Sequence, residues 1–509
     1  MPRKPSAVIG VDVGTSGCKA LVLDEWGRLL ASASHGYEIR RGADGEVTHD
    51  ARDYVRAAHR TIRECVRQID RPVEALAFTG PAHYGVLVGA DEEPLCRTLL
   101  ASDGRPSPVA DGLRTALGDS FFETTYAQLT AGWTFPQLVW LRRANPQLWP
   151  RLRHVLVTKD YVRYRFTGQA TTDPSDATGT AMVDQATGAW SERLCREAGV
   201  TVEQMPTILP STSVGGQLRP EWARRLGIRA GTPVAVGATD TAAELVALGA
   251  VRAGASLVKI ASTGTVVAVS REPHPDRRLL TYPHAIPGHW YSLAATNTAA
   301  RAYTWLRGSV FRTPDGSFTA AYEEMDRLAS RVSPGAAGLL FLPYLEGERA
   351  PRWDADLRGA FLGLSSAHGP EHLARAVLEG VAFSLRACLE LLESCGFRIA
   401  DPFLGGGGMS SRLWRAIVVA ALGRTGRLAE PQGPAIGAAI LAAAAIGLPP
   451  GATPAGRPSV IAVRPNASWA EAYERLFPLY AAAGAATTEI SHALQAAAGG
   501  SSLCGPGSA

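Results

Sequence analysis

Residues 237–265 read GATDTAAELVALGAVRAGASLVKIASTGT, and the rest of the chain is organised around this stretch. It places Asp240 at the start of an apolar helical run, and a strand-like segment then leads into Thr263, Gly264 and Thr265. A glycine turn lets backbone amides approach phosphate oxygens, hydroxyls donate hydrogen bonds, and a carboxylate can accept a proton from an alcohol. These features are typical of a phosphotransferase. Taken alone, the stretch also fits a helix N-cap at Asp240 and an ordinary hairpin turn.

Length and composition indicate an ordinary globular protein of two domains. The chain has 509 residues, of which 46% are hydrophobic and 19% charged, and this length exceeds what one core supports. The formal net charge is +4, and the arginines that carry most of the positive charge are interspersed with acidic residues. We therefore expect no nucleic-acid partner.

The cysteines and apolar runs predict a cytoplasmic protein without a membrane partner. Seven cysteines lack CxxC or Cys/His spacing, so neither a disulfide framework nor a zinc site is indicated. The N-terminal apolar run breaks at Asp12, so it is no signal peptide. The apolar run 435–448 is shorter than the ~20 residues of a membrane span, and we expect it to form a buried helix.

A second hydroxyl-rich turn lies near the N-terminus. The β-branched run that starts at residue 7 ends in DVGTSG, residues 12–17, and a second strand follows over 18–24. Such a turn can hold phosphate oxygens while the carboxylate of Asp12 orients hydrated Mg²⁺, although the motif judged alone favours a plain hairpin turn. Since a strand, a Gly-Thr turn and a strand recur over 256–270, we expect a duplicated α/β unit that binds one nucleotide.

Three further stretches carry candidate ligand contacts. Strand ends line crevices in α/β folds, so His83, after the strand 73–79, can contact a ligand or be a hydrogen-bonded structural residue. In LLASDGR, Asp103 and Arg105 lie on one side of an extended chain and suit a polyol, or form a surface ion pair. Four glycines at 405–408, between a strand and a helix, let a nucleotide lie against bare backbone, or form a flexible turn.

Together these motifs resemble those of the FGGY carbohydrate kinases, most closely the xylulokinase-like members. In chain order they are DVGTSGCK (12–19), TGPAHYG (79–85), ASDGR (101–105), GATD (237–240), STGT (262–265), LPYLEGERAPRWDADLRGAFLGL (342–364), HLARAVLEG (372–380), GGGGMSSRLWR (405–415) and PAIGAA (434–439). The resemblance covers about residues 7–480, and 359–379 fits the family's second signature in full.

The resemblance implies an α/β fold of two ribonuclease-H-like lobes, of the actin, hexokinase and sugar-kinase type, around a central cleft. We expect an N-terminal lobe over 1–245 on the sugar, phosphate and Mg²⁺ side, a C-terminal lobe over 246–485 on the nucleotide side, and a disordered tail over 486–509. The implied reaction moves the γ-phosphate of ATP to a sugar hydroxyl, and a homodimer is left open. The same fold also serves ATP-driven chaperones and filament proteins, which would lack a cluster of sugar-side residues.

The resemblance also assigns roles to individual residues. Asp240 corresponds to the catalytic base, and Asp12 would serve Mg²⁺. The substrate-side residues would be Ala82, His83, Asp103, Arg105 and Asp240. Contacts to ATP and its phosphates would come from Gly14, Thr15, Ser16, Lys19, Thr263, Gly264, Thr265, Gly405, Gly406, Gly407 and Gly408.

Several positions depart from the family pattern. They are Pro81 and Ala82 where xylulokinases usually have Gln-Met, Ala101 for a tryptophan, Gln137 for a lysine and Thr241 for an asparagine. All lie near or toward the substrate side, so we expect phosphoryl transfer to be kept, while the sugar is left open by these positions. The likeness to xylulokinases, closest over residues 342–380, implies a ketopentose, D-xylulose first. D-Ribulose, another ketose such as an L-ketose, a polyol and gluconate are alternatives. Glycerol is disfavoured, because the Arg-Glu pair of glycerol kinases is absent after Gly85.

Overall fold

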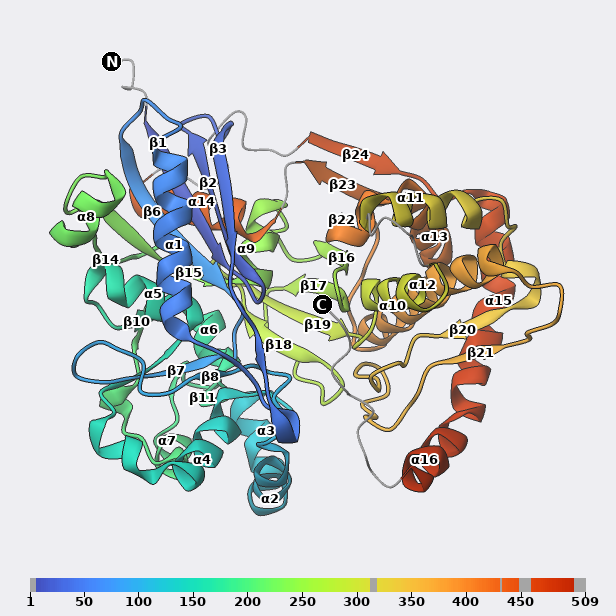
Figure 1. Ribbon diagram of the computed structural model, residues 1–509, viewed down its shortest axis with the longest axis horizontal. Coiled ribbons are helices and arrows are strands. Elements are labelled where there is room, and N and C mark those ends of the chain that lie inside the picture. The colour runs from blue at the N-terminus through green and yellow to red at the C-terminus, as the bar shows by residue number, and fades with distance from the viewer. Residues whose placement is uncertain (1–5, 312–317, 431–432, 448–458, 499–509) are drawn as a thin grey trace. The chain divides into compact units, whose positions relative to one another are not determined.

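The computed structural model of the protein describes residues 6–311, 318–430, 433–447 and 459–498, which form two compact units (Figure 1). The first unit consists of Met1–Ala253, Val269–Tyr291 and Glu430–Ser459, and the second of Gly254–Ala268, Ser292–Ala429 and Val460–Ala509. Each unit therefore draws on segments that are far apart in sequence.

A six-stranded sheet forms the centre of the first unit. Its strands, in spatial order, are β14 (Val214–Gln217), β15 (Pro233–Thr239), β6 (Val73–Gly80), β1 (Ala7–Val13), β2 (Gly17–Asp24) and β3 (Leu29–Gly36). The strands β1, β2 and β3 pair antiparallel, whereas β6 adds to β1 in parallel and β15 adds to β6 in parallel. The carboxyl ends of β1, β6 and β15 consequently lie at the same edge, where ligands bind in open α/β sheets.

Alternating side chains of β1 divide the core of the first unit into two layers. Ile9 and Val11 pack with α1 (Ala51–Val66), while Val8 faces the opposite layer with α14 (Pro434–Ala445). A Cβ atom at Gly10 would lie 1.9 Å from a backbone carbonyl oxygen of α14, so glycine is what lets the helix pack directly on the strand. The expected buried helix over 435–448 is confirmed as α14 up to Ala445, whereas residues 446 and 447 form a turn and residue 448 lies outside the described residues.

The second sheet repeats these strand relations. Its order is β18 (Leu280–Pro283), β19 (Trp290–Ala295), β17 (Gly264–Ser270), β16 (Ser256–Ile260), β22 (Phe403–Gly405), β23 (Gly426–Glu430) and β24 (Ser459–Val463). As β1 does with β2 and β6, β16 pairs antiparallel with β17 and in parallel with β22. The expected duplication of the α/β unit is therefore confirmed.

Helices and short strands complete both units. In the first unit the helices include α2 (Ser107–Leu117), α3 (Asp119–Thr125), α4 (Thr134–Ala144), α5 (Thr158–Thr167), α6 (Pro174–Gly179), α7 (Glu192–Ala198), α8 (Pro220–Leu226) and α9 (Asp240–Ala247), and the strands β5 (Val47–His49) and β8 (Thr98–Leu99). In the second they include α10 (Ala300–Val310), α11 (Phe318–Ala329), α12 (Pro370–Ser394), α13 (Arg412–Leu422), α15 (Ala467–Ala486) and α16 (Thr488–Ala497), with β20 (Leu340–Leu342) and β21 (Ala360–Leu362).

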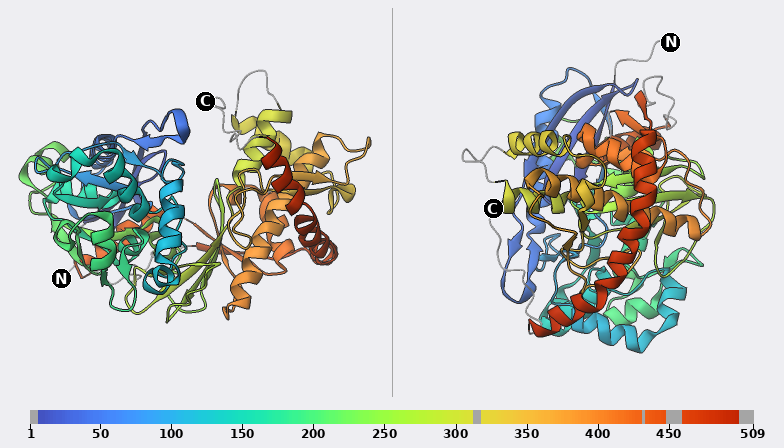
Figure 2. Two further views of the ribbon diagram at one scale, coloured as in Figure 1. Left: turned by 90° about the horizontal axis from the view of Figure 1, so that it is seen from below. Right: turned by 90° about the vertical axis from the view of Figure 1, so that its right-hand side faces the viewer.

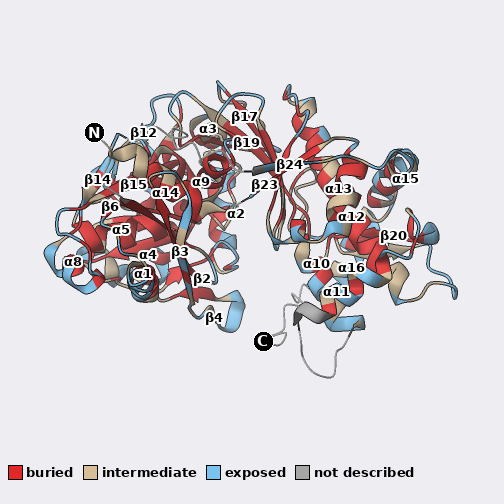
Figure 3. Cartoon of the chain, turned by 90° about the horizontal axis from the view of Figure 1, so that it is seen from above, coloured by how far each residue is buried: buried red, intermediate tan, exposed pale blue. Residues whose placement is uncertain are grey.

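The interior of the second unit holds an ion pair within α12. The Nε of Arg375 donates to Oε1 of Glu379 at 2.6 Å, and the hydroxyl of Tyr473, on α15, donates to the same oxygen at 2.8 Å. All three side chains are buried. Figure 3 shows much of α12 in red, the colour of buried residues. Glu379 has its pKa raised by burial, which Arg375 opposes, so the arginine is what makes a buried carboxylate tolerable here.

The C-terminal region differs from the expected disordered tail. Residues 488–497 form α16, which follows α15 with one residue between them (Figure 2). Alanine has the highest helix propensity, and two side chains fasten the helix: Ser491 accepts a hydrogen bond from the amide of Arg358 at 3.4 Å, and Nε2 of His492 lies 2.8 Å from Oδ2 of Asp354. Residues 499–509 lie outside the described residues. None of the described helices is both long and apolar enough to cross a membrane.

Candidate active site

Asp240 lies where strand β15 passes into helix α9. Thr239, the last residue of the strand, caps the helix, because its hydroxyl accepts a hydrogen bond from the amide of Ala242 at 3.3 Å. Asp240 is the first helical residue, and its Oδ1 accepts from the amide of Thr241 at 2.6 Å and from the Thr241 hydroxyl at 3.2 Å. The interpretation of Asp240 as the N-cap is therefore wrong. Its partly exposed carboxylate lies at a helix N-terminus, which favours negative charge.

The turn between β1 and β2 presents hydroxyl groups to solvent. An amide-to-carbonyl hydrogen bond from Gly14 closes the turn at 2.9 Å, and Thr15 and Ser16 are exposed. Asp12 and Lys19 lie opposite each other in the register of the two strands. The predicted phosphate-side and Mg²⁺-side residues near the N-terminus thus share one hairpin.

Tyr84 contacts this hairpin and is affected by the charge of Asp240. Its hydroxyl lies 3.3 Å from Oγ1 of Thr15. Burial raises the pKa of Tyr84, the hydrogen bond with Thr15 opposes that shift, and the charge of Asp240 adds to it. The contact between Thr15 and Tyr84 thus joins two stretches that are distant in sequence, and Asp240 acts on the same phenol electrostatically.

An aromatic cluster of Tyr37, His49 and Tyr54, which the sequence did not predict, contacts the turn of this hairpin. The hydroxyl of Tyr37 donates a hydrogen bond to the carbonyl of Gly14. The rings of Tyr37, His49 and Tyr54 pack edge to face, with centroids 5.3 to 5.4 Å apart. These residues form no motif, and only the fold brings them beneath the turn. Their contact restricts the backbone of the predicted phosphate loop.

His83 has a left-handed backbone, with φ of 79°. This conformation is uncommon for a residue with a side chain, and strain of this kind gathers at functional sites. Nδ1 lies 2.6 Å from the carbonyl oxygen of Gly179, which can only accept, so Nδ1 carries a proton and a neutral ring has its lone pair on Nε2. The ring packs edge to face on Trp133, at 4.5 Å between centroids, and Ala82 beside it is buried.

Asp103 and Arg105 form a partly buried pair, not the surface ion pair considered above. The carboxylate of Asp103 is 1% exposed and accepts from the Nε of Arg105 at 2.9 Å and its Nη2 at 2.6 Å. The amides of Val47 and Arg105 donate to the same carboxylate at 3.0 and 3.1 Å. Four donors occupy its acceptor sites, so a sugar contact at Asp103 remains a prediction that requires exchanging one of them. The guanidinium of Arg105 lies 4.8 Å from the ring centroid of Trp140.

In the second unit, reciprocal hydrogen bonds fix the turn that leads into β17. The amide of Gly264 donates to Oγ1 of Thr296 at 3.1 Å, and the amide of Thr296 donates to the carbonyl of Gly264 at 2.8 Å. Thr263 and Thr265, on either side, stay partly exposed. The turn is therefore rigid at its glycine while the two predicted phosphate contacts beside it are accessible.

The four glycines at 405–408 begin at the last residue of strand β22 and differ in what surrounds them. A Cβ atom at Gly406 would lie 2.3 Å from the carbonyl oxygen of Ile260, and one at Gly408 would lie 2.3 Å from the Ile260 side chain. Gly407 is exposed, and a Cβ atom there would meet nothing within 4 Å. Packing against β16 thus requires two of the glycines, so they are more than a flexible turn, and Gly407 presents bare backbone.

The donor atoms at the first hairpin fit Mg²⁺ that arrives with substrate phosphates. Among the described residues, no group of three or more His, Cys, Asp or Glu side chains is placed to hold a metal ion. Mg²⁺ usually keeps several waters and takes one or two carboxylates plus substrate phosphates. Both carboxylate oxygens of Asp12 lie 3.9 Å from the Cβ position of Gly14, so this carboxylate is directed at the turn that carries the exposed hydroxyls.

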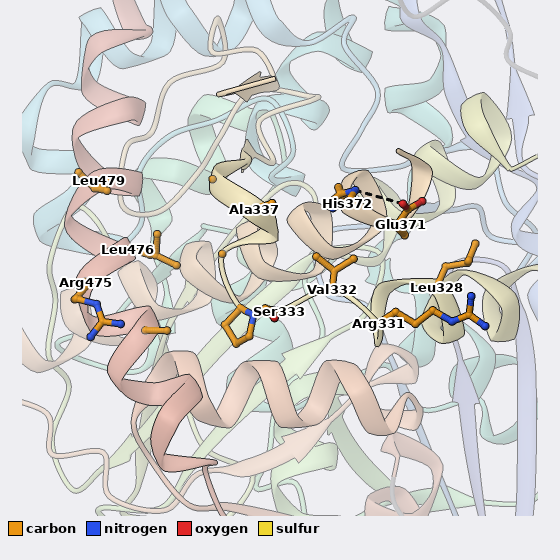
Figure 4. Close-up of a pocket in the computed structure, with 14 residues that line it drawn as sticks. Leu328, Arg331, Val332, Ser333, Ala337, Glu371, His372, Arg475, Leu476 and Leu479 are labelled. Carbon is orange, nitrogen blue, oxygen red and sulfur yellow. Dashed lines mark ion pairs between the residues drawn. The ribbon is translucent and has the colours of Figure 1, made fainter. Parts of the chain in front are cut away.

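A pocket of about 780 Å³ in the second unit lies elsewhere (Figure 4). It is lined by the end of α11 and the segment that follows it, by the first turn of α12 and by residues of α15. At one side, Nδ1 of His372 lies 3.5 Å from Oε1 of Glu371. None of the predicted site residues of this unit lines it. The pocket is therefore separate from the predicted nucleotide contacts.

Comparison with known proteins identifies the family. The N-terminal domain of the FGGY family of carbohydrate kinases matches residues 7–247, and the C-terminal domain of the same family matches residues 257–446. These matches cover most of the chain, which therefore belongs to the FGGY family of carbohydrate kinases. The chain is thus a phosphotransferase with the two-domain sugar-kinase fold, and the expected fold and enzyme class are confirmed. Membership of a kinase family also removes the chaperone alternative.

Several relatives are similar over nearly the whole chain. The xylulose kinase of Escherichia coli strain K12 is 32% identical over 85% of this chain and 89% of its own length, and that of Bacillus subtilis strain 168 is 29% identical over 86% and 87%. Among solved structures, a xylulose kinase from Rhodospirillum rubrum gives a TM-score of 0.86 at 28% identity, covering 96% of this chain and 100% of that one. A gluconate kinase from Lactobacillus acidophilus gives 0.87 at 25% identity, covering 95% and 98%.

Proposed function

We propose that this kinase transfers the γ-phosphoryl group of ATP to a hydroxyl of a ketopentose, with D-xylulose as the first candidate. The observation that carries the proposal is the 32% identity to the xylulose kinase of Escherichia coli, over 85% of the chain. Gluconate is the second candidate, because a gluconokinase of Bacillus licheniformis is 26% identical over 81% of the chain.

Asp240 is the proposed general base. Phosphoryl transfer depends mainly on positioning and on neutralising charge, so a base need only orient the sugar hydroxyl and accept its proton. The carboxylate of Asp240 is partly exposed, and its hydrogen bonds to Thr241 use only Oδ1 in the described contacts. His83, held by its hydrogen bond to α6, would contact the sugar from the same unit.

The other predicted residues would hold the nucleotide. In the first unit, the hydroxyls of Thr15 and Ser16 and the amides of their turn would bind phosphate oxygens, with Lys19 on the same hairpin, and Asp12 would hold Mg²⁺. Mg²⁺ supplies charge neutralisation at the phosphates. In the second unit, Thr263, Gly264 and Thr265 would bind the γ-phosphate, and the backbone of residues 405–408 would lie against the nucleotide.

A substrate screen tests the proposal. Release of ADP is measured with purified protein, ATP and Mg²⁺ over a panel of pentuloses, hexuloses, polyols and aldonates. We expect the highest kcat/KM with D-xylulose. Highest activity on a hexulose, a polyol or gluconate would refute the ketopentose, and ATP hydrolysis that no sugar accelerates would refute the sugar-kinase proposal as a whole.

A further inference from the structure

A cluster of charged side chains lies fully buried beneath the junction that carries Asp240. Nζ of Lys159 lies 2.6 Å from Oδ1 of Asp160, 3.0 Å from Oδ1 of Asp173 and 2.9 Å from Oδ2 of Asp176. Arg163 joins the cluster at 2.9 Å from Asp160. Two cations thus face three carboxyl groups, and all five side chains are at most 1% exposed. Burying so many charges costs folding free energy even when they are paired, so stability alone does not explain why the fold keeps them.

The cluster donates hydrogen bonds to the backbone of strand β15 at an irregularity in its pairing. The pairing of β15 with β6 shifts register between Ala235 and Ala238, and Gly237 there has φ of 79°. The carbonyl of Val236 accepts hydrogen bonds from Arg163 Nη1 at 2.6 Å and from Lys159 Nζ at 3.3 Å. Bulges beside active sites redirect the side chains that follow them. The two cations therefore hold the bend that sets the direction of the chain entering α9.

Helix α6 links the same cluster to Thr239, the residue before Asp240. Asp173 caps this helix, and its Oδ2 accepts from the amide of Ser175 at 2.9 Å and from the Ser175 hydroxyl at 2.5 Å. The hydroxyl oxygen of Ser175 in turn accepts from the amide of Thr239 at 3.1 Å. A continuous chain of contacts thus runs from Lys159 through Asp173 and Ser175 to the backbone at the start of α9.

The C-terminal end of α6 contacts two of the predicted sugar-side residues, Ala82 and His83. The carbonyl of Gly179 accepts from Nδ1 of His83 at 2.6 Å. A Cβ atom on Gly179 would lie 2.4 Å from the Cβ atom of Ala82, so the helix end and this loop are in direct contact. One six-residue helix therefore touches both His83 and the strand end that precedes Asp240.

We infer that Ser175, anchored by the buried Lys159 cluster, is a positioning residue that fixes Asp240 relative to His83 for catalysis. This inference rests on the proposed function, since it assumes that Asp240 and His83 act on the sugar. Misplacing reacting groups by about 1 Å can cost up to ~10²-fold in rate, so a single buried hydroxyl at this junction can affect turnover.

Two serine substitutions separate positioning from stability. Ser175→Ala removes the hydroxyl that joins Asp173 to the amide of Thr239. Ser211→Ala is the matched control, because the Ser211 hydroxyl is also buried and also donates to Oδ2 of Asp173, at 3.4 Å. Among the described residues, Asp173 is the hydrogen-bond partner of this hydroxyl, whereas Ser175 also binds the amide of Thr239. Each variant thus removes one buried hydroxyl from the same carboxylate.

Steady-state kinetics and thermal unfolding are measured for both variants and the wild type with the best sugar of the screen. We expect Ser175→Ala to lower kcat about 10-fold with the KM for ATP unchanged, and Ser211→Ala to keep kcat within about 2-fold, at comparable Tm. Equal kcat for the two variants, or a loss that simply follows Tm, would overturn the inference. If the wild type phosphorylates no sugar, the proposed function fails instead, so the two failures are distinguishable.

Discussion

The role of Asp240 can be tested by one substitution that keeps the local structure. In Asp240→Asn the amide oxygen can still accept the hydrogen bonds from the amide and hydroxyl of Thr241, and Thr239 remains the cap of α9. The variant loses only a charge at a helix N-terminus, worth about 0.3–1 kcal/mol. For domains of this size that corresponds to a change in Tm of at most about 4 °C. A general base contributes ~10²–10⁴-fold, or about 3 to 5 kcal/mol of barrier, so stability and rate should separate clearly.

The assay is ADP release with the best sugar, beside ATP binding by calorimetry and thermal unfolding. We expect kcat to fall at least ~10²-fold while ATP affinity is retained. Asp50→Asn is a matched control, because Asp50 caps α1 by accepting from the amide of Arg52 at 2.9 Å and is not among the predicted site residues. If Asp240→Asn keeps kcat within about 5-fold of the wild type, Asp240 is not the base. Asp103 would then be a poor replacement, because four donors already occupy its carboxylate.

Three further predictions concern stability. Burial raises the pKa of Glu348 to about 7, so between pH 4.5 and 7 the folded state keeps a proton that the unfolded chain releases. The free energy of unfolding of the wild type therefore falls as the pH rises through this range. In urea unfolding at a series of pH values, the free energy of unfolding of Glu348→Gln should therefore rise by about 3 kcal/mol relative to that of the wild type between pH 4.5 and 8. The same pH dependence for both proteins would contradict this. Gly437→Ala places a Cβ atom 1.7 Å from a carbonyl oxygen of α9 and should lower the free energy of unfolding by about 3 kcal/mol in the same assay. In the control Gly308→Ala the new Cβ atom meets nothing within 4 Å, so the free energy of unfolding should stay unchanged or rise by up to about 1 kcal/mol. Arg375→Met leaves Glu379 buried without its cation and should cost about 3–5 kcal/mol; a smaller loss in the Arg375→Met/Glu379→Leu double variant would show that the uncompensated charge is the cause.

The parts of the site that the sequence predicts are those built by neighbours in the chain. The turn at 12–17 and the turn before β17 both follow buried strands, and their glycines and hydroxyls are adjacent in sequence, so local chemistry identifies them. The helices α12 and α14 are likewise predictable, since their apolar residues are continuous or regularly spaced.

The parts that the sequence does not predict depend on contacts between distant residues. Ser175 reaches the amide of Thr239 across 64 positions, and the amide of Val47 reaches Asp103 across 56. No spacing rule connects such pairs, because tertiary packing alone decides which buried polar groups meet. For the same reason α14 could be predicted as a buried helix, but not that it packs on β1, more than 400 residues earlier in the chain.

Two of the departures from the family pattern, Ala82 and Thr241, lie on the proposed sugar side of the site. Ala82 lies against Gly179, and Thr241 donates both its amide and its hydroxyl to Asp240, so each of these two positions touches α6 or the proposed base directly. The residues proposed to hold phosphate instead sit on turns whose geometry is fixed by backbone hydrogen bonds and by close packing at glycine. Substitutions at Ala82 and Thr241 can therefore change which sugar fits without disturbing the turns.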